Sequence, residues 1–126
     1  MMTALAVAGG GAIGALLRHF MNGAVMAILP LSFPFGIVAI NIVGSFLMGV
    51  LTGVFALGND PSQTMKVFLI VGVLGGFTTF SAFSLDSVML WQRGEFALSL
   101  LYVLSTVVFS IGALVLGLWL VRVLSS

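Results

Sequence analysis

The sequence contains no cysteine and very few charged residues. Its 126 residues include only four Lys and Arg, three Asp and Glu, and one His. Without cysteine, the chain can form neither disulfides nor thiolate metal sites. One histidine and three scattered acids provide no acid–base pair and no metal-ligand set, which argues against an enzyme. Four basic residues also make no basic surface of the kind that binds nucleic acid, so no nucleic-acid partner is expected.

Apolar residues make up most of the chain. They account for 61% of it, and the mean hydropathy is +1.34. No formal charge occurs between Arg18 and Asp60, a stretch much longer than the ~20 residues that one crossing of a bilayer needs. A soluble domain of this size would not stay in solution with such a composition. We therefore expect an integral membrane protein.

Four apolar spans predict a single all-α transmembrane domain over residues 1–126. The spans cover about residues 3–29, 32–57, 64–92 and 96–124. Pro30 and Pro34 mark the first turn, the hydrophilic loop at residues 58–63 the second, and the segment at 93–95 the third. Small residues at four-residue spacing predict close helix packing in two places. These are Gly10 and Gly14 in the first span, and Ser45, Gly49 and Gly53 in the second.

The third span contains a pattern that a plain membrane helix does not need. Two adjacent glycines, Gly75 and Gly76, are followed by Thr78 and Thr79. Glycine and β-branched threonine are poor helix formers, so we expect the helix to break between Gly75 and Thr79. Backbone carbonyls leave the helical ladder at such a break, and they survive at membrane depth only where protein or a water-filled cavity covers them.

Polar and aromatic side chains follow this break at helical spacing. Phe80 and Phe83 share one face, and Ser81 and Ser84 share the neighbouring strip. Asn41 is the one strongly polar residue inside the second span, and Tyr102, Thr106 and Ser110 form a polar stripe on the fourth. Taken singly, phenylalanines at this spacing usually pack in a core, and a lone Asn usually joins two helices. Their occurrence together indicates a path for an ion.

The basic residues are divided equally between the two ends of the spans. Lys66 and Arg122 lie on the side of the N-terminus, and Arg18 and Arg93 lie on the opposite side. The positive-inside rule then favours neither orientation. A chain without this bias can insert both ways up, and the two forms can pair as an antiparallel dimer. The alternative is that the N-terminal amine or a partner decides the orientation.

The sequence resembles the Fluc family of fluoride channels, the bacterial CrcB proteins, over its whole length. The resemblance rests on the four spans and on three motifs: residues 14–18 (GALLR), residues 41–44 (NIVG) and residues 75–84 (GGFTTFSAFS). It implies an antiparallel, dual-topology homodimer in the cell inner membrane. It also implies two fluoride pores and a structural sodium ion (Na+) at the dimer axis, held by backbone carbonyls of the broken third helices.

The resemblance also assigns roles to individual residues. Gly75 and Thr78 match the positions whose carbonyls face the sodium ion. Phe80, Phe83 and Asn41 match residues that line the fluoride pathway, and Tyr102 and Ser110 match its polar track. Thr106 stands where the track often has Ser, and Asp86 stands where relatives carry Glu. The pathway is expected to comprise Asn41, Phe80, Ser81, Phe83, Ser84, Tyr102, Thr106 and Ser110. Arg18 is expected at the interface, where it would line a vestibule.

Two other classes of membrane protein fit the size. A small dual-topology multidrug exporter also has four spans, but it needs a carboxylate in an early helix to exchange protons for a cationic drug. Neither of the first two spans contains an acid. A purely structural subunit would leave the break in the third span without a purpose. A fluoride channel with lipid, fluoride and a second copy of the chain as its partners is therefore the preferred interpretation.

Overall fold

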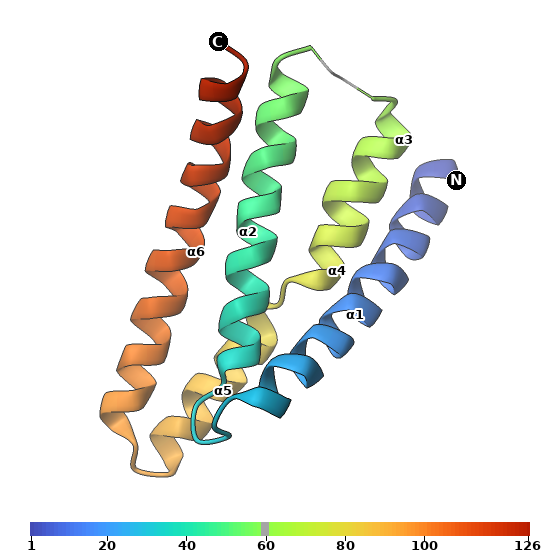
Figure 1. The fold of residues 1–126 in the computed structure, drawn as a ribbon. Coiled ribbons are helices and arrows are strands. Elements are labelled where there is room, and N and C mark those ends of the chain that lie inside the picture. Colours follow the sequence, from blue (N-terminus) through green and yellow to red (C-terminus); the bar gives the residue numbers. More distant parts are fainter. Residues whose placement is uncertain (59–60) are drawn as a thin grey trace.

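The computed structural model describes residues 1–58 and 61–126, and the described parts are helices joined by short turns. Four helical segments run alongside one another, and each is long and apolar enough to cross a membrane (Figure 1). They are Met2–Ile28, Phe35–Ala56, Gln63–Gln92 and Phe96–Leu124. Both termini lie at the same end of the bundle. The prediction of an all-α, multi-pass membrane protein is confirmed, whereas its dimeric assembly stays a prediction.

Turn residues explain where the helices begin and end. Helix α1 (Met2–Ile28) stops two residues before Pro30, and α2 (Phe35–Ala56) begins directly after Pro34. Past the end of α2, Gly58 has a φ of +89°, and past the end of the third span Gly94 has a φ of +79°. Glycine adopts this left-handed conformation without strain, and it commonly terminates helices in this way. Of the hydrophilic loop predicted at residues 58–63, Asn59 and Asp60 lie outside the described residues.

The third span is not a single helix. It consists of α3 (Gln63–Lys66), a π-helical segment η1 (Val67–Leu74), α4 (Gly75–Phe77) and α5 (Phe80–Gln92). Ser62 caps its start by accepting a hydrogen bond from the Met65 amide at 3.2 Å. The chain is extended at Thr78 (φ −82°, ψ 157°) and Thr79 (φ −152°, ψ 120°), which separate α4 from α5. The predicted break is therefore present.

The position of the break corrects the role expected of the two glycines. Gly75 and Gly76 are helical, and the extended residues are the two threonines that follow. Gly76 is instead required for packing, because a Cβ added there would lie 2.7 Å from the carbonyl oxygen of Gly11 in α1. The same holds one turn earlier, where a Cβ on Gly72 would lie 2.9 Å from the Cα of Gly10. Glycines on both helices thus let α1 approach the first half of the third span closely.

A second close contact joins α2 to α6 (Phe96–Leu124), the pair with the most extensive packing in the fold. A Cβ on Gly49 would lie 2.2 Å from the Leu114 carbonyl oxygen, and a Cβ on Gly117 would lie 2.5 Å from that of Phe46. A Cβ on Gly53 would lie 3.1 Å from the Cβ of Val121. The packing stripes predicted on the first and second spans therefore correspond to contacts, except that Ser45 faces a cavity.

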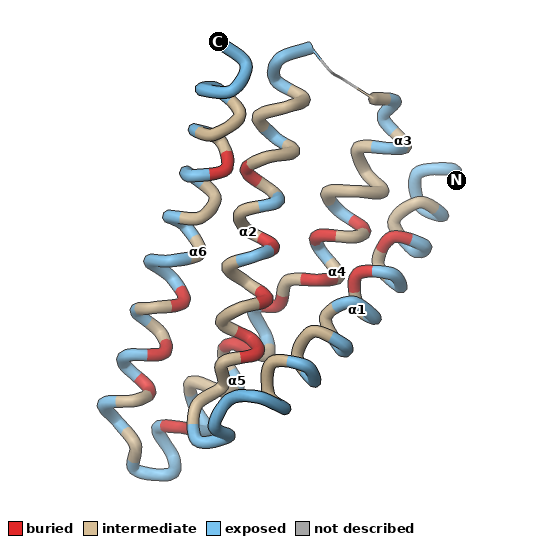
Figure 2. The backbone as a smooth tube through the Cα atoms, in the orientation of Figure 1, coloured by how far each residue is buried: buried red, intermediate tan, exposed pale blue. Residues whose placement is uncertain are grey.

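The buried core is small and lies where α5 meets α2 and α6. Its buried members are Ile37, Ile40, Phe77, Phe83, Leu90 and Tyr102. Figure 2 shows buried positions on the sides of the helices that face one another, with exposed positions along the outer sides of α1 and α6. Much of the exposed surface is apolar, which suits contact with lipid or with another membrane protein.

Candidate functional site

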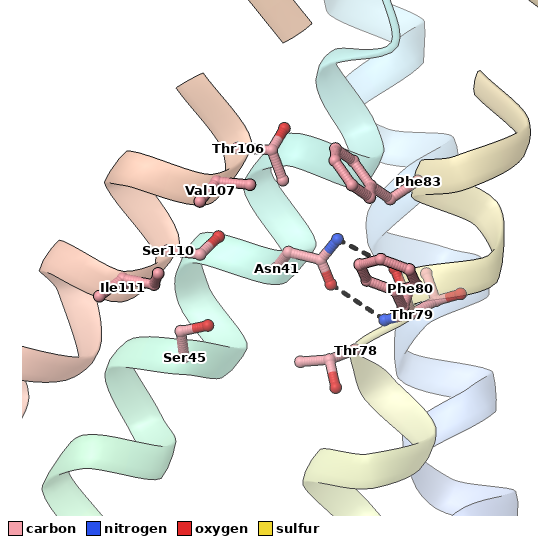
Figure 3. A pocket seen from close by; sticks show the side chains of 10 residues that line it. All are labelled: Asn41, Ser45, Thr78, Thr79, Phe80, Phe83, Thr106, Val107, Ser110 and Ile111. Carbon is pink, nitrogen blue, oxygen red and sulfur yellow. Dashed lines mark hydrogen bonds between the residues drawn. The ribbon is translucent and has the colours of Figure 1, made fainter. Parts of the chain in front are cut away.

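The break in the third span is held in place by Asn41 of α2. The Asn41 Nδ2 donates a hydrogen bond to the Thr79 carbonyl at 3.1 Å, and its Oδ1 accepts one from the Thr79 amide at 2.9 Å (Figure 3). One turn along α2, Gly44 makes room for the Thr78 methyl group, because a Cβ there would lie 2.2 Å from Thr78 Cγ2. The NIVG motif therefore supports the extended residues: its asparagine bonds both the backbone amide and the backbone carbonyl of Thr79, and its glycine leaves room for the Thr78 side chain.

Two hydrogen bonds at the break leave the backbone carbonyls of Gly75 and Thr78 without their usual helical partners. In a continuous helix, the Thr79 amide would donate to the Gly75 carbonyl and the Ala82 amide to the Thr78 carbonyl. The first of these amides donates to Asn41, and the second donates to the Thr79 Oγ1 at 3.1 Å, which caps α5. The carbonyls of Gly75 and Thr78 therefore lose their helical partners, and both are available to a cation or to another donor.

A cavity of about 410 Å³ lies beside the break, between α2, α5 and α6. We call it the Asn41 cavity. Its lining residues are Asn41, Ser45, Thr78, Thr79, Phe80, Phe83, Thr106, Val107, Ser110 and Ile111 (Figure 3). Among these described residues there is no charged side chain, whereas six carry a hydroxyl or amide group. The cavity can donate several hydrogen bonds to an ion without holding it by a full opposite charge.

Two residues that line the Asn41 cavity carry hydroxyl groups with no hydrogen-bond partner among the described residues. Thr106 Oγ1 and Ser110 Oγ are buried, and within the described residues neither makes a hydrogen bond. Both lie on α6 and line the cavity one turn apart. An unpaired buried hydroxyl costs free energy, so these groups are expected to bind a ligand or water that enters the cavity.

The two phenylalanines border the cavity in different environments. The rings of Phe80 and Phe83 are 5.4 Å apart between centroids and inclined at 56°. Phe83 is buried, and its ring packs on that of Tyr102 at 5.3 Å. Phe80 is 78% exposed although the preceding residue, Thr79, is buried. Its ring therefore projects from the surface of the single chain. Both rings can turn a positively polarised edge toward an anion.

Tyr102 does not line the Asn41 cavity with the other two residues of its stripe. It is fully buried, and its hydroxyl donates to the Asp86 carboxylate at 3.1 Å. Its ring also meets Phe33, whose centroid is 5.6 Å away. Because Tyr102 packs on Phe83, it is placed to orient that ring, and the Asp86 hydrogen bond holds the tyrosine in turn.

A second cavity, of about 530 Å³, lies on the other side of the break. We call it the Arg18 cavity, and it is lined by Ala15, Arg18, His19, Asn22, Ile37, Thr79, Ser81, Ala82 and Leu85. Arg18 thus lines a cavity, as a vestibule residue would. Ser81 faces this cavity and lies 3.3 Å from the Thr79 hydroxyl. Ser84 lines neither cavity, and its hydroxyl donates to the Phe80 carbonyl of its own helix at 3.0 Å.

Comparison with known proteins assigns the chain to a family. Residues 5–118 match the family described as "CrcB-like protein, Camphor Resistance (CrcB)". The chain belongs to the CrcB family. Similar CrcB-family proteins include one from Rhodopseudomonas palustris (strain BisB5), 45% identical over 98% of this chain and 100% of the relative. Another, from Agrobacterium fabrum (strain C58 / ATCC 33970), is 48% identical over 97% of this chain and 98% of its own. Both carry the name "Fluoride-specific ion channel FluC".

The site residues predicted for this CrcB-family chain are distributed between the two cavities and the break. Asn41, Phe80, Phe83, Thr106 and Ser110 meet at one cavity, Arg18 and Ser81 meet at the other, and Gly75 and Thr78 carry the released carbonyls. Sequence reasoning missed the role of Thr79, which caps α5, pairs with Asn41 and lines both cavities. It also missed Asn22 as a lining residue of the Arg18 cavity. The one available signal was its spacing, because Asn22 stands one helical turn after Arg18.

Proposed function

We propose that this protein is a fluoride-selective channel of the cell inner membrane that lets cytoplasmic fluoride leave passively. The observation that carries the proposal is the Asn41 cavity, whose lining combines uncharged hydrogen-bond donors with two phenyl rings. Two of these donors, the hydroxyls of Thr106 and Ser110, have no partner among the described residues. The proposal is supported by the relatives named fluoride-specific ion channels, which match nearly the whole chain at 45–48% identity.

The chemistry of fluoride suits this lining. Removing such a small anion from water costs on the order of tens of kcal/mol in an idealised estimate, so several donors must replace its hydration shell. Each charge-assisted hydrogen bond returns about 1.5–3 kcal/mol. One Nδ2 hydrogen of Asn41 is engaged by Thr79, which leaves the second for an anion, together with the α6 hydroxyls and the phenyl edges. A lysine or arginine at this depth would hold the anion too tightly for rapid exit.

We further propose that the functional unit is an antiparallel homodimer with two pores. A single chain leaves Phe80 78% exposed and the Asn41 cavity without a cover on that side, so a second copy would complete its wall. Antiparallel pairing is supported by the basic residues. Lys66 and Arg122 lie at the end of the bundle that holds both termini, and Arg18 and Arg93 lie toward the other end.

A structural sodium ion at the dimer axis is the third part of the proposal. The residues fit such an ion, because hard cations prefer oxygen ligands and the carbonyls of Gly75 and Thr78 have lost their helical partners. Bound there, sodium would offset the repulsion between the carbonyl dipoles of two facing chains. Exhaustive replacement of sodium by N-methylglucamine should then weaken the dimer and lower fluoride flux. Unchanged dimer stability after sodium removal would contradict the site.

The membrane potential suffices to drive the export. About 2.3 kcal/mol per charge is available for each 100 mV, and the inside-negative sign expels an anion. The weak acid HF enters cells as a neutral molecule and dissociates at cytoplasmic pH, so fluoride accumulates inside and an open selective pore removes it. No coupled ion is needed, and α1 and α2 contain no Asp or Glu of the kind that a proton-coupled multidrug exporter uses.

The direct test uses liposomes that contain only the purified protein. Fluoride efflux under a potassium-diffusion potential, followed with a fluoride electrode, should exceed that from empty liposomes by orders of magnitude. Chloride efflux under the same potential should stay near the background. Absence of fluoride efflux, or equal passage of chloride, would contradict the proposed function.

A further inference from the structure

Ser45 lines the Asn41 cavity from α2, although its place in the sequence predicts a packing role. It stands one turn after Asn41 and one turn before Gly49, in the row of small residues on that helix. Gly49 does touch α6, because a Cβ there would lie 2.2 Å from the Leu114 carbonyl oxygen. Ser45 instead borders open volume, and Figure 3 shows its hydroxyl pointing from α2 toward the side of the cavity on which Thr78 lies. Close packing therefore does not account for a hydroxyl at this position.

The Ser45 hydroxyl makes no hydrogen bond within the described residues. Hydroxyls of the third span are used differently. Those of Thr78, Ser84 and Ser87 each donate to the carbonyl one turn earlier in the same span, at 2.9, 3.0 and 2.8 Å. Ser45 is half-buried, so its hydroxyl is not enclosed by neighbouring side chains. Such a hydroxyl can donate to an ion in the cavity without giving up a bond within the protein.

Beyond Ser45, the gap between α2 and α6 is closed by contact between the two helices. Both helices run toward the end of the bundle that holds the termini (Figure 1). A Cβ on Gly117 would lie 3.2 Å from the backbone carbonyl carbon of Gly49. One turn later on both helices, a Cβ on Gly53 would lie 3.1 Å from the Cβ of Val121. No ion can continue between α2 and α6 past contacts of this kind.

The same register orders the hydrogen-bond donors along the cavity. Extended back from these contacts, it places Ser110 beside Asn41, and Ser45 almost one turn, or roughly 5 Å, farther toward the termini. Among the described lining residues of α6, the one that follows Ser110 is Ile111, which is apolar. An anion that leaves the Ser110 hydroxyl in this direction therefore meets Ser45 as its next donor, and the closed contact beyond keeps it from following α6 further.

We propose that the Ser45 hydroxyl is a further fluoride ligand of the pathway, which receives the ion from Ser110 at the end of the cavity nearest the termini. This inference rests on the proposed fluoride channel and extends its pathway from α6 to α2. A small anion that leaves one donor has to be met by another, because an anion without compensating hydrogen bonds is costly to keep out of water. Ser45 supplies that donor.

Two substitutions of the same shape separate the hydroxyl from the packing. Ser45→Thr keeps a hydroxyl and Ser45→Val replaces it by a methyl group, and the cavity of about 410 Å³ has room for the added carbon in both. Ser45→Ala removes the hydroxyl without adding volume. Fluoride efflux from liposomes should fall about tenfold in Ser45→Ala and Ser45→Val, the loss expected for one charge-assisted hydrogen bond. Ser45→Thr should stay close to the parent.

Thr52→Val is the matched control, because it replaces a hydroxyl by a methyl group at an exposed position of α2 outside the cavity. Its efflux should equal that of the parent. Thermal unfolding in detergent is the second measurement. Since Ser45 makes no hydrogen bond within the described residues, Ser45→Ala should unfold at the same temperature as the parent while its efflux falls. A residue that only packs would not separate the two quantities in this way.

Three outcomes would overturn the inference while fluoride conduction by the parent stands. The first is efflux from Ser45→Ala equal to that of the parent. The second is equal efflux from Ser45→Thr and Ser45→Val, because the hydroxyl would then make no difference. The third is a loss of efflux in Ser45→Ala together with a lower unfolding temperature, because the residue would then support the fold and not the ion. Absence of fluoride efflux from the parent would overturn the proposed function itself, and the inference with it.

Discussion

The Thr106 hydroxyl has opposite effects on stability and on the proposed conduction. It is buried without a partner among the described residues, which costs stability, yet it belongs to a residue that lines the Asn41 cavity, where an anion needs donors. Thr106→Val keeps the side-chain shape and removes the hydroxyl. We expect the free energy of unfolding to rise by about 1 kcal/mol. Fluoride flux should fall about tenfold, the loss expected for one charge-assisted hydrogen bond.

Thr52→Val is the matched control, since it makes the same chemical change at an exposed position of α2 outside the cavity. Thermal unfolding in detergent and fluoride efflux from liposomes measure the two quantities. If Thr106→Val conducts as well as Thr52→Val, the hydroxyl takes no part in the pathway.

Replacing Phe80 and replacing Phe83 should affect folding stability differently, although both rings are proposed to line the fluoride pathway. Replacing either ring by Ile removes its positive edge and keeps apolar volume, so both variants should lose most of their fluoride flux. Phe83 is buried against Tyr102, and its replacement should also cost about 1–2 kcal/mol of folding stability. Phe80 is largely exposed in the chain, and Phe80→Ile should cost less. Efflux and thermal unfolding of both variants, with gel filtration as the check on assembly, test this prediction. Full flux in both would mean that the rings only pack.

At the scale of the helices, the adjacent glycines of α4 should respond differently to the same change. A Cβ on Gly76 would lie 2.7 Å from a backbone oxygen of α1, so Gly76→Ala should force the two helices apart and cost about 1–3 kcal/mol. At Gly75 the nearest atom would be 3.7 Å away, and Gly75→Ala should be tolerated or slightly stabilising. Thermal unfolding of the two variants measures the difference. An equal loss in both would show that the contact with Gly11 is not what requires glycine here.

For the whole molecule, the balance of basic residues predicts that orientation can be set by added charge. Gln63→Lys with Ser126→Lys should bias the end that holds the termini toward the cytoplasm, and Ser32→Lys with Gln92→Lys should bias the opposite end. Each variant alone should lose the antiparallel dimer and fail to protect cells against fluoride, and coexpression of both should restore protection. Reporter fusions at the C-terminus measure the orientation. A single orientation of the unmodified chain would exclude dual insertion.

The extent to which these features could be predicted differs by scale. Membrane spans follow from composition and length, because a charge-poor stretch has no stable place outside the bilayer and Pro34, Gly58 and Gly94 interrupt helices locally. The break in the third span was also predictable from local sequence, because weak helix formers cluster there. The residues that are extended at the break were not, because Gly76 and Thr79 are both poor helix formers and only their neighbours distinguish them.

The features of the site that could not be predicted depend on contacts between segments far apart in the sequence. The hydrogen bonds between Asn41 and Thr79 join residues 38 positions apart, and no local pattern shows that the asparagine bonds the backbone amide and carbonyl of that residue. Helical periodicity places Tyr102, Thr106 and Ser110 on one face of α6, but the packing of α5 encloses Tyr102 with Phe83 and leaves the other two open to a cavity. Periodicity specifies which side chains share a face. What that face meets depends on how the helices pack, and the glycines at their crossings set that packing by allowing the backbones to touch.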